Sequence, residues 1–156
     1  MTDTTLLQLF TDDIGTAQQL LELIEAEHQA LNERDLARLQ DILTQKLPLL
    51  SLLDQHGTER ADVLTAEQLS PDREGLQILA SRSTEGSSLL ARSEELNELL
   101  AQCREANLRN GRIIRSNQAS LSSVMSILRG GDATPGLYDS RGSAAKIGQQ
   151  RPLSQA

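Results

Sequence analysis

The fold is decided by residues 71–129, which read PDREGLQILASRSTEGSSLLARSEELNELLAQCREANLRNGRIIRSNQASLSSVMSILR. Apolar and small residues recur here in steps of three and four, which places them on one face of a helix. That face consists of Leu76, Leu79, Ser83, Ser87, Leu90, Ser93, Leu96, Leu100, Cys103, Asn107, Asn110, Ile114, Asn117, Leu121, Val124 and Leu128. If residues 71–129 form one helix, it is about 88 Å long at 1.5 Å per residue.

The ends of this helix are predicted by residues with known terminal preferences. Ser70 is a favourable N-cap, Pro71 suits the first helical position, and Asp72 complements the positive end of the helix. Gly130 and Gly131 stop the pattern. The segment before Ser70 is therefore a separate arm.

This first arm, residues 4–66, has nearly the same length and a second helical pattern. Its register shifts at residues 32–35, which form either a short turn or a bend, and Pro48 predicts a kink. After the shift the apolar stripe resumes at Leu36, Leu39, Leu43, Leu47, Leu50 and Leu53. Two matched arms favour an antiparallel, coiled-coil-like hairpin or an elongated bundle, and a tight turn at residues 32–35 gives a compact three-helix bundle instead.

Composition supports an all-α fold. Leucine dominates the apolar residues, with one Phe, one Tyr and no Trp, and this set favours helices over sheets. With so few aromatic side chains, we expect a thin leucine-lined seam between helices rather than a thick core.

The charge and the single cysteine restrict the function. The net charge is −9 over residues 1–70 and about +1 in each of residues 71–129 and 130–156, which favours pairing between the arms and argues against nucleic acid. One cysteine excludes an intrachain disulfide. No signal segment or membrane span is recognisable, so we expect a soluble, cytoplasmic protein without stable membrane insertion.

The composition changes after residue 129. Residues 130–156 hold five of the ten glycines and two of the four prolines, too few apolar residues to offset the entropy of ordering. We therefore expect a helical body at 1–129 and a flexible C-terminal tail at 130–156. Tyr138, the one tyrosine, either anchors an interface or folds back onto the body.

No motif predicts catalysis, a cofactor or a metal. Glu25 and His28 have the Glu-x-x-His spacing of di-iron bundles, but such sites use the motif twice. Cys103 lies on the apolar face and is interpreted as a buried structural cysteine, because a nucleophile needs a base and an accessible pocket.

Polar residues on the long helix allow two interpretations. Arg104, Arg109, Arg112 and Arg115 either bind an anionic partner or pair with the acidic first arm. Asn107, Asn110 and Asn117 stand where leucine would stabilise more. They either fix the register of the seam or mark a stretch that awaits a helix from another protein.

Several short patterns occur in a fixed order along the chain, namely Glu27…Leu31, Asp35…Leu39, Lys46, Asn107-x-x-Asn110-Gly-x-Ile-Ile114, Leu128-Arg-Gly-Gly and Tyr138-Asp-x-x-Gly142. This ordered set resembles the FlgN family of flagellar export chaperones. Leu137 departs slightly from the family pattern, which often has a small polar residue there.

The resemblance implies a cytoplasmic chaperone that binds the hook–filament junction proteins FlgK and FlgL and delivers them to the type III export gate. It gives Tyr138 a role in docking to the gate protein FlhA. It makes the C-terminal region the cargo site, with candidate cargo contacts at Ile113, Ile114, Leu121, Val124 and Leu128. The seam asparagines Asn107, Asn110 and Asn117 complete the set of predicted partner-binding residues. The alternatives are a self-associating coiled-coil structural or adaptor protein and a ferritin-like metal enzyme.

Overall fold

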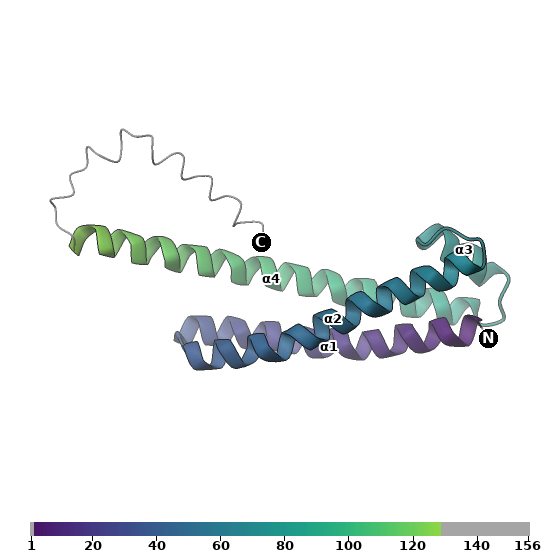
Figure 1. Cartoon of the computed structure of the whole chain (residues 1–156), viewed down its shortest axis with the longest axis horizontal. Coiled ribbons are helices and arrows are strands. Elements are labelled where there is room, and N and C mark those ends of the chain that lie inside the picture. Colours follow the sequence, from purple (N-terminus) through teal and green to yellow (C-terminus); the bar gives the residue numbers. More distant parts are fainter. Residues whose placement is uncertain (1, 129–156) are drawn as a thin grey trace, which may run out of the picture. The chain divides into compact units, whose positions relative to one another are not determined.

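The computed structural model describes residues 2–128, with side chains described through residue 119, and in this range every regular element is an α-helix (Figure 1). The helices are α1 (Thr2–Glu33), α2 (Leu36–Ala66), α3 (Arg73–Ser81) and α4 (Gly86–Leu128). The all-α prediction is confirmed. The chain separates into two units, residues 1–112 and 113–156, and α4 spans the division. The predicted tail at 130–156 lies outside the described residues.

Residues 32–35 contain a turn between α1 and α2, which resolves the choice left open by the sequence. Arg34 adopts a left-handed conformation with φ 56°, and the amide of Asp35 donates to the carbonyl of Ala30 at 3.0 Å. This is a helix C-cap made without glycine. The Asp35 carboxylate then accepts the amide of Arg38 at 3.1 Å and caps α2. The chain reverses here, and α1 and α2 pack side by side.

The predicted single helix over residues 71–129 is wrong, because residues 82–85 separate α3 from α4. The Ser83 hydroxyl accepts the amide of Glu85 at 2.9 Å and donates to the Asp3 carboxylate. Such local bonds compete with helical ones. Gly86 is required at this break, because a Cβ there would lie 2.1 Å from the carbonyl oxygen of Ala80. The break between α3 and α4 thus depends on contacts that cannot be predicted from the spacing of the apolar residues.

The start of α3 also differs from prediction by two residues. Asp72, not Ser70, is the N-cap, and its carboxylate accepts the amide of Gly75 at 3.2 Å. The Ser70 hydroxyl donates to the same carboxylate at 2.6 Å. A Cβ on Gly75 would meet the Ser70 carbonyl oxygen at 1.8 Å, so the chain folds tightly over the beginning of the helix.

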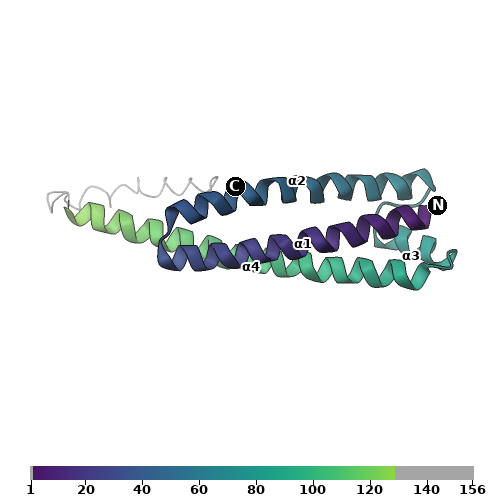
Figure 2. The ribbon, with the colours of Figure 1, turned by 90° about the horizontal axis from the view of Figure 1, so that it is seen from below.

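The core of residues 1–112 is organised around α1, which lies between α2 and the first part of α4 (Figure 2). One buried cluster joins all four helices and contains Leu6, Phe10, Ile14, Ala17, Leu64, Leu76, Leu79, Leu89 and Leu96. A second contains Leu20, Ile24, Cys103 and Ala106. On α4 the buried positions Leu89, Leu96 and Cys103 recur every seven residues, which is the spacing of a coiled-coil seam. The core is therefore the thin leucine seam that the composition predicts.

Cys103 is buried, as predicted. The residue is 4% exposed and its Sγ lies 3.7 Å from the carbonyl oxygen of Ala17. Burial raises the pKa of the Cys103 thiol, which disfavours the reactive thiolate.

The leucine stripe of α2 is not the buried seam that the pattern predicts. Only Ile42, Lys46 and Leu64 are buried on this helix, and Pro48 lies inside it. Four leucines of the predicted stripe are exposed, namely Leu36, Leu43, Leu47 and Leu50. The other two leucines of the stripe are half-buried, and Leu53 packs against the second core cluster.

Candidate partner-binding site

Asn110 joins α4 to α1 within residues 1–112. Its Nδ2 donates to the carbonyl of Ile24 and to Oε1 of Glu27, each at 2.9 Å, and the residue is 2% exposed. An isolated buried amide would be costly, but this one is hydrogen-bonded. Of the two interpretations for the asparagines, Asn110 fits the one in which it sets the register of the seam. This burial excludes direct contact between the Asn110 side chain and a partner that binds this conformation.

Glu27 extends this polar contact to α2. Its carboxylate lies 3.3 Å from Nζ of Lys46, and Nζ also donates to Oδ1 of Asn107 at 3.5 Å. Three helices therefore meet in one hydrogen-bonded group, which we call the Glu27–Lys46 junction: Glu27, Lys46, Asn107 and Asn110. Asn107 accepts this bond with its side-chain oxygen Oδ1, although the residue as a whole is exposed.

The arginines of α4 divide between the two predicted interpretations. Arg109 bonds to the Glu25 carboxylate of α1 at 3.0 Å, as expected for pairing with the acidic first arm. Arg104, Arg112 and Arg115 are exposed, and none of them has an ion pair among the residues whose side chains are described. An anionic partner remains a prediction for these three.

The second unit, from Ile113, carries the other predicted contacts. Ile113 is half-buried, Ile114 is 39% exposed, and residues 115–119, including Asn117, are exposed. Leu121, Val124 and Leu128 lie on α4, but their side chains fall outside the described part. Tyr138 lies outside the described residues altogether.

The sequence reasoning did not predict a buried ion cluster at Asp13. The Asp13 carboxylate is fully buried, lies 2.6 Å from Nδ1 of His56 and contacts the Arg60 guanidinium. Burial lowers the pKa of Arg60, whose guanidinium also lies over the Phe10 ring at 5.2 Å. The available signal was a carboxylate on the apolar face of α1, between Phe10 and Ala17. The cluster links α1 to α2.

Glu25 and His28, the two residues of the Glu-x-x-His motif, contact protein side chains in this structure. Glu25 binds Arg109, and Nε2 of His28 lies 3.4 Å from Nδ2 of Asn32. Among the residues that the structure describes, no group of three His, Cys, Asp or Glu side chains is placed to hold a metal ion. The described helices also include none that is long and apolar enough to cross a membrane.

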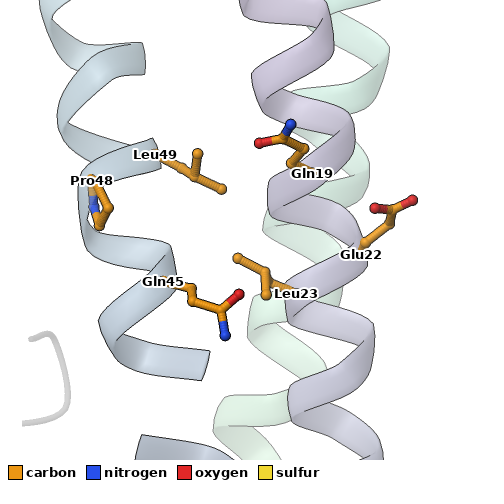
Figure 3. A pocket seen from close by; sticks show the side chains of 6 residues that line it. All are labelled: Gln19, Glu22, Leu23, Gln45, Pro48 and Leu49. Atoms are coloured by element: carbon orange, nitrogen blue, oxygen red, sulfur yellow. The ribbon is translucent and has the colours of Figure 1, made fainter. Parts of the chain in front are cut away.

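An open groove of about 460 Å³ separates the middle of α1 from α2 (Figure 3). Leu23 and Leu49 point into it from opposite sides, with the amides of Gln19 and Gln45 nearby. Glu22 and Pro48 complete the lining. The groove has no nucleophile beside a base, so it gives no basis for a catalytic assignment.

The sequence model of one known protein family, the FlgN protein family, matches residues 1–146 of this chain. The chain belongs to the FlgN family. The resemblance inferred from the sequence is thereby confirmed.

A solved FlgN structure agrees with this membership. It is a crystal structure from Pseudomonas aeruginosa, assigned provisionally as a flagella synthesis protein, FlgN. It is 51% identical to this chain, with a TM-score of 0.68, and the match covers 80% of this chain and 95% of that one. No curated protein matches the chain. FlgN is a family of flagellar chaperones rather than enzymes, and both findings support a flagellar export chaperone role.

Proposed function

We propose that this FlgN-family chain is a cytoplasmic chaperone that binds the junction proteins FlgK and FlgL and delivers them to the export gate protein FlhA. Family membership and the flagella synthesis neighbour support the general role. The observation that carries the proposal is the change along α4. Cys103, Ala106 and Asn110 are buried, whereas the side chains from Ile114 to Ala119 are exposed.

The proposed cargo surface follows from this change in burial. Asn107 lies at its edge, and its further members are Ile113, Ile114, Asn117, Leu121, Val124 and Leu128. An amphipathic helix of an unassembled junction protein would pack on these residues as a coiled-coil partner. Each Å² of apolar surface so removed from water contributes roughly 25 cal/mol.

Release at the gate requires that binding be moderate. Ordering of chain segments on binding opposes part of the gain from buried surface. Tyr138 is proposed to contact FlhA rather than cargo, because the family resemblance gives the tyrosine this role and an aromatic side chain is a favourable interface anchor.

The cargo surface is tested by calorimetric titration of FlgK into full-length protein carrying Ile114→Glu. We expect at least about tenfold weaker binding, because a carboxylate would be buried in an apolar contact. Leu108→Glu is the matched control, since Leu108 is an exposed α4 leucine outside the proposed surface, 57% exposed. Equal affinity of Ile114→Glu and the wild type for FlgK would refute the assignment.

Tyr138→Ala tests the gate contact separately. We expect unchanged FlgK affinity and weaker binding of the chaperone–cargo complex to the cytoplasmic part of FlhA. The reverse result would move Tyr138 to the cargo surface. A stable dimer with no affinity for FlgK or FlgL, measured by light scattering and calorimetry, would favour the self-associating coiled coil instead.

A further inference from the structure

The open groove between α1 and α2 has apolar walls that the described fold leaves in contact with water (Figure 3). Leu23 of α1 and Leu49 of α2 face each other across the groove, and both are half-buried. Its volume of about 460 Å³ lies within the usual range of binding sites. The groove can therefore accept an apolar side chain from outside.

The surface beside the groove continues along α2. Gln45, Pro48 and Leu52 follow one another in steps of three and four, so they share one face of the helix, and Leu52 is 36% exposed. Pro48 has no amide hydrogen, so the carbonyl of Thr44 lacks its usual donor within α2. Apolar walls next to a hydrogen-bond acceptor suit side chains with an aliphatic stem and a donor at the tip, as in lysine and arginine.

Three carboxylates border the groove. Glu22 is one of its lining residues. Asp12 lies seven residues before Gln19 on α1, and Asp41 lies four residues before Gln45 on α2, so each continues the face on which that lining residue stands. Asp12, Glu22 and Asp41 are exposed, and none has an ion pair among the residues whose side chains are described.

Within the described helices α1 and α2, no free base offsets these carboxylates. α1 contains no lysine or arginine. The basic residues of α2 all have ion-pair partners: Arg38 with Glu33, Lys46 with Glu27 and Arg60 with Asp13. Of the three, Arg38 alone shares the face that borders the groove, seven residues before Gln45. The groove therefore combines apolar walls with a rim whose unpaired charges are acidic.

We propose that the α1–α2 groove binds a basic segment of another protein, in which an apolar side chain is flanked by lysine or arginine. The apolar side chain packs between Leu23 and Leu49, and its basic neighbours pair with the three carboxylates of the rim. The α1 or α2 helix of a second copy fits poorly, because it would bring further carboxylates against this rim. The proposal concerns the α1–α2 pair and does not rest on the cargo surface proposed on α4.

The test uses two synthetic helical peptides of about three heptads with leucines at the same positions. One peptide has lysine at the positions that flank the leucines, and the other has glutamate there. Binding to the full-length protein is measured by fluorescence anisotropy, after the self-association of each peptide has been determined. We expect the lysine peptide to bind about tenfold tighter, because it gains contacts with three carboxylates, and this preference to shrink with added salt.

Charge reversal at the rim separates the groove from the general attraction of an acidic protein for a basic peptide. Glu22→Lys with Asp41→Lys should weaken binding of the lysine peptide at least about tenfold. Asp54→Lys with Glu105→Lys is the matched control, since each double substitution changes the net charge from −7 to −3. Asp54 lies nine residues beyond Gln45 and so on the opposite side of α2, and Glu105 is on α4. We expect this control to keep most of the preference for the lysine peptide.

The apolar wall is tested by Leu23→Gln. We expect binding of the lysine peptide to weaken about tenfold, because the leucine of the peptide loses its apolar neighbour. Leu47→Gln is the matched control, since Leu47 is 56% exposed and lies two residues from Gln45, on the other side of α2. Circular dichroism of every variant verifies that it remains helical.

Three results would overturn the proposal. The first is equal affinity for the two peptides, or an equal loss of binding in a variant and its matched control. The second is a dimer in sedimentation equilibrium that Leu23→Gln abolishes, which would make a second copy the occupant. The third is peptide binding only after removal of residues 129–156, which would make the chain's own C-terminal segment the occupant.

Discussion

The Glu27–Lys46 junction allows a sharp test of what holds three helices in register. The two charged side chains are only 15% and 10% exposed, so removing one partner leaves a nearly buried charge. Such losses cost about 3 kcal/mol. After Glu27→Leu, the Lys46 ammonium retains only the Asn107 oxygen at 3.5 Å, and we expect the free energy of unfolding to fall by about 3 kcal/mol.

Removing Lys46 instead of Glu27 should lower the free energy of unfolding by a smaller amount. After Lys46→Met, the Glu27 carboxylate still accepts the Asn110 amide at 2.9 Å, and we expect a loss of about 2 kcal/mol. The double variant removes both charges and replaces them with apolar groups of similar size. Its loss should also be about 2 kcal/mol, which gives a coupling energy of about 3 kcal/mol in a double-mutant cycle.

The assay is urea unfolding of the full-length protein followed by far-ultraviolet circular dichroism, supported by thermal unfolding. A loss of 3 kcal/mol should lower the melting temperature by about 12 °C for a folded unit of this size. Glu94→Leu is the control, because the Arg73–Glu94 pair is 69% and 53% exposed and should contribute less than about 0.5 kcal/mol. Additive single losses, with no coupling, would refute a buried pair at this position.

Three further predictions concern other parts of the bundle. Gly86→Ala should destabilise the protein by more than about 2 kcal/mol in urea unfolding, because the new Cβ meets a carbonyl oxygen at 2.1 Å. Gly15→Ala should stabilise it by about 0.5–1 kcal/mol, since a Cβ there meets nothing within 4 Å inside a helix; equal effects of the two changes would contradict the close approach at Gly86. The Cys103 thiol should react slowly with a thiol reagent in the folded protein and rapidly in urea, since burial raises its pKa; equal rates would contradict its burial. The hydrogen bond from Ser70 and the amide of Gly75 lower the pKa of Asp72, so its stabilising effect is present above the ordinary carboxyl pKa and is lost as pH falls through the lowered value. Asp72→Asn should reduce that acid-dependent loss, and an unchanged pH profile of stability would contradict the cap.

The candidate site shows where sequence reasoning succeeded and failed. Asn110 was correctly singled out as a polar residue on the seam, but only the structure shows that Ile24 and Glu27 satisfy it. The pattern places Leu36, Leu43, Leu47 and Leu50 on one face of α2, but a periodic pattern shows which residues share a face and not whether that face is buried.

The sequence by itself determined that the chain is helical, that its seam is thin and leucine-rich, and that Cys103 lies on a buried face. These properties follow from residue propensities and from the helical period, both of which act over a few neighbouring residues. The sequence leaves either a turn or a bend at residues 32–35, and the local bonds of Asp35 to Ala30 and Arg38 make it a turn. The tertiary structure alone decided that residues 82–85 separate α3 from α4, where Ser83 bonds to Asp3, and that Leu36, Leu43, Leu47 and Leu50 of α2 are exposed. Both of these outcomes depend on how segments far apart in the chain pack together, which no local pattern encodes.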